Sequence, residues 1–237
     1  MRVTSNLKYT AAALLTMSLM FLGCSLGKLR PGRPSSSGNG NSSGTTAFKP
    51  SGDPQKDVGD ALKKLKTAYP YRVTETISAT MNGQSAMQAT SRVAEFAAPD
   101  RSRVKLSGDG GQNVEMITIG EKDYTFSDGK WTESAGTSAA EKAKMGTDME
   151  KMLSSALKDV QSAGSETVNG VPCFVYTYRI ELPTFGKDAV GTGKAWIGAA
   201  DGLPHQMDSE LKTGGYDQKS HIVYEYNIDA KIEKPIP

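Results

Sequence analysis

Residues 71 to 133 form a series of short strand-like segments whose connections are too short to contain a helix. Tight turns are signalled at Asn82-Gly83, at Gly120 and at Asp128-Gly129, and the segments between them alternate apolar with polar residues. Parallel strands need a crossover connection of about a dozen residues or more. The sequence therefore predicts that these strands pair antiparallel with their neighbours along the chain.

Strand patterns resume in the last third of the chain, where the alternation is strongest. From residue 174 to 182 the apolar residues share one face, and from 222 to 228 the pattern repeats. The expected strands of the first series begin at Tyr71 and continue at 87–96, 101–106, 113–119, 122–127 and 130–133, and those of the second include 174–182, 191–198, 205–211 and 222–228.

Helices are predicted on either side of the first series. Asp53-Pro54 has the form of a helix start, with a capping acid followed by proline, and an apolar face follows it through Leu65. Between Ser138 and Val160 the sequence has two capping boxes, at Ser138 to Glu141 and at Thr147 to Glu150. We therefore expect two short helices in this interval.

The second of these predicted helices carries an apolar stripe rich in methionine. Such a stripe is most often ordinary core, but methionine also repacks around variable apolar partners, so a movable lid is the second interpretation. The predicted fold class is α+β, with a large, curved antiparallel sheet of about eleven strands covered by about three helices. The folded domain is expected to span residues 53–237.

The N-terminal 24 residues have the layout of an export signal. Arg2 and Lys8 precede an uncharged apolar run from Tyr9 to Leu22, which is shorter than the ~20 residues that a spanning helix needs. The end of this segment, Gly23-Cys24, resembles the lipobox of bacterial lipoproteins. The resemblance implies cleavage after residue 23 and attachment of acyl chains, palmitate among them, to Cys24. Plain secretion and an uncleaved anchor remain the alternatives.

Several acyl chains on one cysteine would make a stable membrane anchor, since each buried methylene contributes ~0.8 kcal/mol. In the sorting rule that accompanies the resemblance, Ser25 in place of aspartate favours the outer membrane, facing the periplasm. Residues 24–52 are rich in glycine, serine and proline and are expected to form a disordered tether of about 30 Å.

Charge gives little support to a nucleic-acid partner. The full chain has 28 basic and 26 acidic residues, and removal of Arg2 and Lys8 with the signal balances the two. Lys28, Arg30 and Arg33 form a small basic cluster beside the anchor, which fits either a solvated tether or attraction to lipid headgroups.

Candidate catalytic residues are few. His205 and His221 are the two histidines, both lie in strand patterns, and neither has cysteine or acid at metal-ligand spacing. Cys173 lies in an apolar strand pattern, where a buried hydrophobic role is favoured. We expect no metal, no cofactor and no enzymatic activity. An enzyme of the cell envelope remains a third alternative, for which no residue pattern gives support.

The order of elements and several local phrases resemble a known family. One helix, about six strands, a helical insertion and about five more strands behind a cysteine resemble the LolA/LolB fold and the related mycobacterial LppX/LprG lipoproteins. The phrases that carry the resemblance are 117–124 (ITIGEKDY), 128–131 (DGKW), 168–172 (VNGVP), 195–198 (AWIG) and 201–204 (DGLP). The resemblance implies an unclosed barrel whose concave apolar face accommodates acyl chains of a lipid or lipoprotein.

We therefore expect a hydrophobic ligand between the sheet and the methionine-rich helix, with no protein partner identified. The tyrosine hydroxyls would supply the few polar contacts of such a pocket. The expected lining is Met149, Met152, Leu153, Leu157, Tyr176, Tyr178, Tyr224 and Tyr226. If these side chains instead fill an ordinary core, the chain would be a non-catalytic envelope scaffold or interaction module.

Overall fold

The computed structural model describes residues 47–107, 113–183 and 189–236. The predicted signal peptide, Cys24 and most of the predicted tether lie outside this part of the chain. The described residues contain two helices and eleven strands, which are α2 (Pro54–Leu65), β1 (Tyr71–Met81), β2 (Gln84–Ala98), β3 (Arg101–Ser107), β4 (Asn113–Ile119), β5 (Lys122–Ser127), β6 (Lys130–Ala135), α3 (Ala139–Ala156), β7 (Leu157–Val168), β8 (Val171–Glu181), β9 (Val190–Gly198), β10 (Pro204–Thr213) and β11 (Tyr216–Tyr226).

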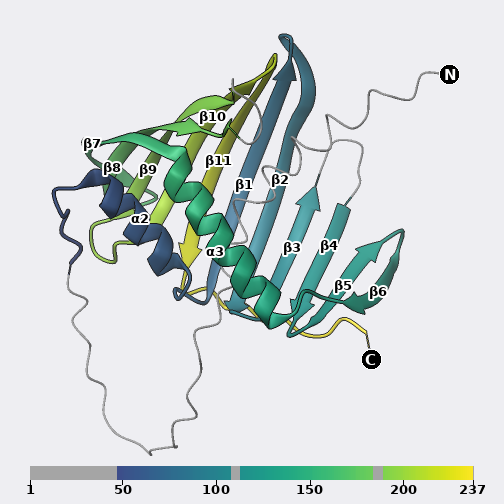
Figure 1. The fold of residues 1–237 in the computed structure, drawn as a ribbon. Coiled ribbons are helices and arrows are strands. Elements are labelled where there is room, and N and C mark those ends of the chain that lie inside the picture. Colours follow the sequence, from purple (N-terminus) through teal and green to yellow (C-terminus); the bar gives the residue numbers. More distant parts are fainter. Residues whose placement is uncertain (1–46, 108–112, 184–188, 237) are drawn as a thin grey trace, which may run out of the picture.

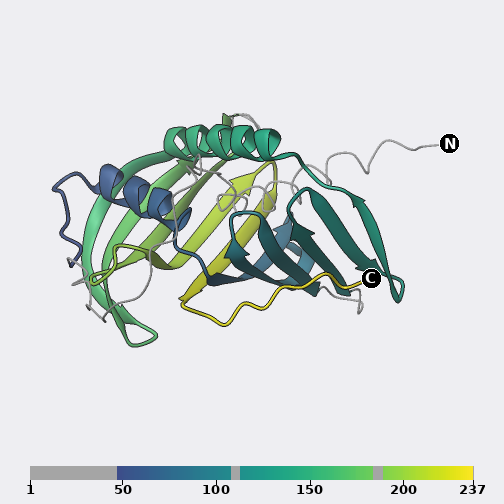
Figure 2. The same ribbon diagram turned by 90° about the horizontal axis from the view of Figure 1, so that it is seen from below.

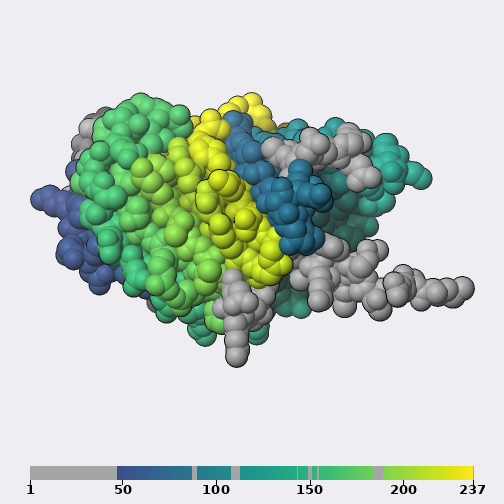
Figure 3. Space-filling view, turned by 90° about the horizontal axis from the view of Figure 1, so that it is seen from above, coloured from purple at the N-terminus to yellow at the C-terminus, as the bar shows by residue number. Residues whose placement is uncertain are grey.

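All eleven strands belong to one antiparallel sheet, in the order β6-β5-β4-β3-β2-β1-β11-β10-β9-β8-β7 (Figure 1). The first and last strands meet in its middle, where Tyr71 of β1 lies opposite Phe96 of β2 on one side and Tyr226 of β11 on the other. In the space-filling view the yellow β11 lies between the blue β1 and the yellow-green β10 (Figure 3). Strands β6 and β7 form the two edges, so the predicted large, unclosed antiparallel sheet is confirmed.

The hairpin between β1 and β2 forms where the sequence predicts it. Asn82 and Gly83 have φ values of 50° and 78°, which a type I′ turn requires at both central positions. The strands then pair with their chain neighbours, as expected from the short connections.

The helical insertion differs from the prediction, because α3 is one continuous helix instead of two. Ser138 caps it, accepting a hydrogen bond from the Glu141 amide while the Glu141 side chain accepts one from the Ser138 amide. Thr147 lies inside the helix, so the second predicted capping box does not begin a new one. A single glycine such as Gly146 costs a helix interior only about 1 kcal/mol, which the continuous ladder tolerates. The expected count of about three helices is therefore two in the described residues.

Both helices lie on the concave side of the sheet (Figure 2). Helix α2 buries Val58, Ala61, Leu62 and Leu65. Helix α3 joins the two sheet edges, since it follows β6 and leads into β7, and it packs mainly on β7 and β8. The concave face is thus the one that both helices cover.

The C-terminal segment lies on the opposite, convex face, beneath the strands in Figure 2. Ile232 is buried there in a cluster with Ile117 of β4 and Tyr124 of β5, and its carbonyl accepts a 3.2 Å hydrogen bond from Arg101. Among the described residues, no helix is both long and apolar enough to cross a membrane.

Candidate functional site

Helix α2 closes one half of the concave face with a filled core. Its buried side chains form one cluster with Leu157 of β7, Tyr176 and Tyr178 of β8, and Ala195 and Ile197 of β9. Three of the predicted lining residues, Leu157, Tyr176 and Tyr178, therefore lie together. They pack against α2 and not, as the sequence had predicted, against the methionine-rich helix.

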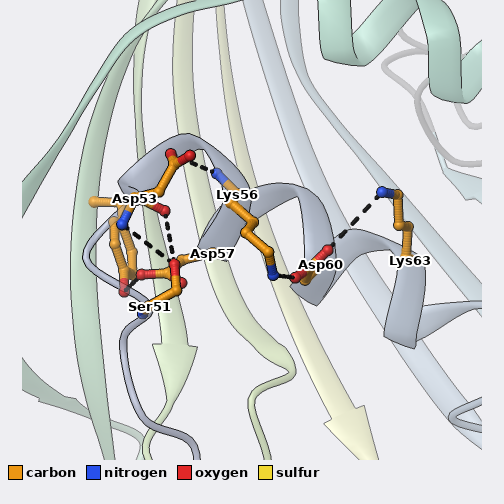
Figure 4. Close-up of polar contacts among 7 residues, drawn as sticks. Ser51, Asp53, Lys56, Asp57, Asp60 and Lys63 are labelled. Atoms are coloured by element: carbon orange, nitrogen blue, oxygen red, sulfur yellow. Dashed lines mark hydrogen bonds and ion pairs between the residues drawn. The ribbon is translucent and has the colours of Figure 1, made fainter.

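A buried carboxylate orients this core. Asp57 of α2 accepts a 3.0 Å hydrogen bond from the Tyr176 hydroxyl and a 2.9 Å hydrogen bond from the Ser51 amide. Burial, and then the hydrogen bond to Asp57, raise the pKa of Tyr176. Figure 4 shows Ser51, Asp53 and Asp57 gathered at the start of α2, with Lys56, Asp60 and Lys63 forming ion pairs along the helix.

Tyr178 is positioned by a glycine on the neighbouring strand. Tyr178 lies opposite Gly193 of β9, and a Cβ atom at Gly193 would be 2.2 Å from the tyrosine ring. The ring therefore covers the glycine backbone, an aromatic-on-glycine pairing found in curved sheets. Burial raises the pKa of the Tyr178 hydroxyl.

The other two predicted tyrosines belong to a second cluster, with Leu65 of α2 and residues of β1 and β2. The Tyr224 hydroxyl donates to the sulfur of Met207 at 3.6 Å, and that of Tyr226 donates to the Pro204 carbonyl. Burial raises the pKa of both tyrosines. Their hydroxyls thus have partners within the protein.

On α3, Leu153 is buried and Met152 is half-buried, and the side chain of Met149 lies outside the described part of the structure. Leu157, which the sequence predicts on this helix, begins β7 instead. The described residues of the predicted lining are therefore divided among the core beneath α2, the cluster around β1 and β2, and α3.

The concave face also holds a pair of charged residues that was not predicted from the sequence. Glu75 of β1 and Arg92 of β2 lie directly opposite one another, 1% and 5% exposed, with 4.0 Å between Oε2 and Nη1. The Ser220 hydroxyl of β11 donates a 3.0 Å hydrogen bond to Glu75 Oε1. Burial raises the pKa of Glu75, while Ser220 and Arg92 act against that rise.

A polar groove of about 900 Å³ lies across strands β7 to β11 and β1. Because Thr177 and Arg179 alternate with the buried Tyr176 and Tyr178, their side chains are on the convex face. The polar residues of this groove include Thr76, Asp159, Thr177, Arg179, Thr192, Lys194, Asp208, Glu210, Lys219 and His221.

The described residues provide little for catalysis. Each histidine pairs with one aspartate, His205 with Asp201 at 3.0 Å and His221 with Asp208 at 2.6 Å. Within the described ranges, no three histidine, cysteine or acidic side chains lie close enough to hold a metal ion. Burial raises the pKa of Cys173 to about 11, which disfavours the reactive thiolate.

Comparison with known proteins identifies the fold. No protein-family model and no curated protein matches the chain. The crystal structure of Mycobacterium tuberculosis lipoprotein LppX matches 76% of this chain and 98% of its own, with 14% identity and a TM-score of 0.50. That of LprF from Mycobacterium bovis matches 80% of this chain and 100% of its own, with 13% identity and a TM-score of 0.50.

A LolA superfamily protein from Nitrosomonas europaea also matches, with 8% identity over 69% of this chain and 88% of its own and a TM-score of 0.31. At these identities the likeness concerns the fold alone. The predicted resemblance to LppX-like lipoproteins is confirmed at the level of the fold by the matches to LppX and LprF.

Proposed function

We propose that this chain is a lipid-anchored protein of the cell envelope that binds a lipid, or the acyl chains of a lipoprotein, on its concave face beneath α3. The observation that carries the proposal is the shared architecture with LppX, a lipoprotein, over 98% of the latter's length. A curved sheet with helices on its concave side offers an apolar surface that a helix can cover or expose.

The start of the described chain indicates where a tether would join the domain. Phe48 packs edge-on against Phe174 with 5.8 Å between ring centroids, and its amide donates a 2.9 Å hydrogen bond to Ala199. Ordered packing thus begins upstream of the expected boundary at Asp53. The predicted tether would join the domain beside the turn between β9 and β10, with Cys24 acylated in an outer membrane that faces the periplasm.

A scaffold with a filled core is the second candidate, and one observation favours it. Leu157, Tyr176 and Tyr178 pack tightly against α2, so the half of the concave face beneath this helix is occupied by the protein itself. Under the binding proposal, the ligand lies on the side of α3.

The substitution Met152→Glu tests the binding site on the full chain. Met152 is half-buried on α3, whereas Met145 on the same helix is 48% exposed, so Met145→Glu is the matched control. Placing a charged side chain in an apolar contact costs several kcal/mol of binding free energy. Met152→Glu should therefore abolish uptake of pyrene-labelled palmitate, measured by fluorescence, while Met145→Glu retains it. Equal uptake by two folded variants, as judged by circular dichroism, would contradict the α3 assignment.

A further inference from the structure

The outward side of α2 carries an excess of positive charge. The helix buries its apolar residues against the sheet, and at about 3.6 residues per turn its opposite side holds four lysines and one aspartate. Asp60 lies between Lys56 and Lys63 and pairs with both (Figure 4). Four positive charges and one negative charge leave a net charge of plus three on this surface. We call it the lysine face, and its residues are Lys56, Asp60, Lys63, Lys64 and Lys66.

Two other surfaces of the domain are balanced in charge. Helix α3 has three lysines and three acidic residues in its sequence. The polar groove on the convex face is lined by three basic and three acidic side chains, besides His221. The excess on the lysine face therefore distinguishes the side of the domain on which both helices lie (Figure 2).

The lysine face lies beside the place where the chain enters the domain. The Lys64 ammonium donates a hydrogen bond to the Asp201 carbonyl, in the turn between β9 and β10. Phe48 is held at the same turn, because its amide donates to the carbonyl of Ala199. The expected tether has a second basic cluster at its far end, made up of Lys28, Arg30 and Arg33. A membrane that holds the end of the tether is therefore within reach of the lysine face.

An anionic lipid surface has the chemistry that complements this face. Four or more basic residues on an amphipathic helix are typical of binding to anionic headgroups. Lysine carries its charge on a long flexible stem, so several lysines can reach headgroups that have no fixed arrangement. The side chains of Lys56 and Lys63 are 59% and 58% exposed, which leaves them accessible to such a surface. Because the lysine face has no apolar side chain, the contact stays at the headgroups and does not enter the hydrocarbon.

We infer that the lysine face of α2 docks on anionic phospholipid headgroups, so that the side of the domain with both helices faces the membrane. The inference goes beyond the proposed function, because it concerns the outer surface of α2 and holds whether or not the concave face carries a ligand. The contact is electrostatic and is therefore weakened by salt.

The test measures how the Cys24→Ser chain, which lacks the covalent anchor, sediments with sucrose-loaded vesicles. Vesicles of phosphatidylcholine alone are compared with vesicles in which a third of the lipid is phosphatidylglycerol. We expect roughly tenfold or stronger binding to the anionic vesicles at low salt, and loss of this preference at high salt. Equal binding to both kinds of vesicle at low salt would overturn the inference and leave the lysine face to an acidic protein. The uptake of pyrene-labelled palmitate tests the proposed function separately.

Substitutions at exposed positions locate the contact. Lys56→Gln with Lys63→Gln removes two charges from the lysine face and should weaken binding to the anionic vesicles roughly tenfold. Lys105→Gln with Lys219→Gln is the matched control, because it removes two lysines of similar exposure, also paired with acids, from β3 and β11. Asp60→Asn raises the net charge of the lysine face and should strengthen binding. An equal loss in the two double variants, or no gain in Asp60→Asn, would overturn the assignment to α2.

Discussion

The hydroxyl of Tyr176 donates a 3.0 Å hydrogen bond to the buried carboxylate of Asp57, joining β8 to α2 across 119 positions of the chain. The second oxygen of Asp57 accepts from the Ser51 amide at 2.9 Å. One carboxylate therefore connects the segment before α2, the helix itself and the concave face of the sheet.

Tyr176→Phe removes this hydroxyl and leaves Asp57 with one donor fewer in a buried place. We expect the free energy of unfolding to fall by about 1–3 kcal/mol, measured by urea denaturation. Tyr224→Phe is the matched control, because within the described residues its hydroxyl donates to the weak acceptor sulfur of Met207. A loss as large in the control would mean that the contact with Asp57 is not the cause.

Gly193→Ala places a methyl group 2.2 Å from the ring of Tyr178. The ring must move, and overpacking of this kind costs about 1–3 kcal/mol. We expect a lower midpoint in urea denaturation and a changed near-ultraviolet circular dichroism signal from the displaced tyrosine. Gly59→Ala is the control, because a Cβ atom added at Gly59 would meet no other atom within 4 Å. Gly170→Ala is unsuitable, because the φ of Gly170 is 81° and alanine would be strained there. Unchanged stability at Gly193 would show that the ring does not depend on it.

Glu75 should make stability depend on pH. Because burial raises its pKa, the folded state keeps the proton to higher pH than the unfolded chain does. The stabilising contribution is complete below the ordinary carboxyl pKa and is lost as the pH rises through the raised value. The unfolding free energy of the native chain minus that of Glu75→Gln should therefore fall with rising pH across this window. A difference that stays constant, or rises, would contradict the direction of the shift.

Cys24→Ser should release the protein from membranes, because serine cannot take the thioether-linked lipid. Fractionation of bacterial envelopes should find the substituted chain in the soluble fraction and the native chain with the membranes. If the substituted chain still sediments with membranes, the lipobox prediction is wrong.

The main features of the sheet could be predicted from the sequence, because tight turns and period-two alternation are local signals. Strand β7 was harder, because its residues are mostly exposed and bulges interrupt its register between Lys158 and Gln161 and between Ser162 and Ser165. The alternation that marks a half-buried strand is therefore absent. The pairing of β1 with β11 also could not be predicted from local sequence patterns, because it joins distant parts of the chain.

Only one member of the Glu75–Arg92 pair had a signal in the sequence. Glu75 stands at an inward position between Val73 and Ile77, so an acid on an apolar face was a visible signal. Its partner, Arg92, depends on the register of the hairpin, which shifts between Ile77 and Thr80. The sequence does not tell which of the two helices covers the tyrosines, because amphipathic patterns show that a face is buried but not which helix covers it.

The most direct measurement is native mass spectrometry with lipid extraction on the Cys24→Ser chain, exported into a bacterial envelope. Without its covalent anchor, any lipid that this protein carries must be a bound ligand. We predict one acyl lipid per folded chain. A folded chain that carries no lipid would contradict it and would favour the scaffold with a filled core.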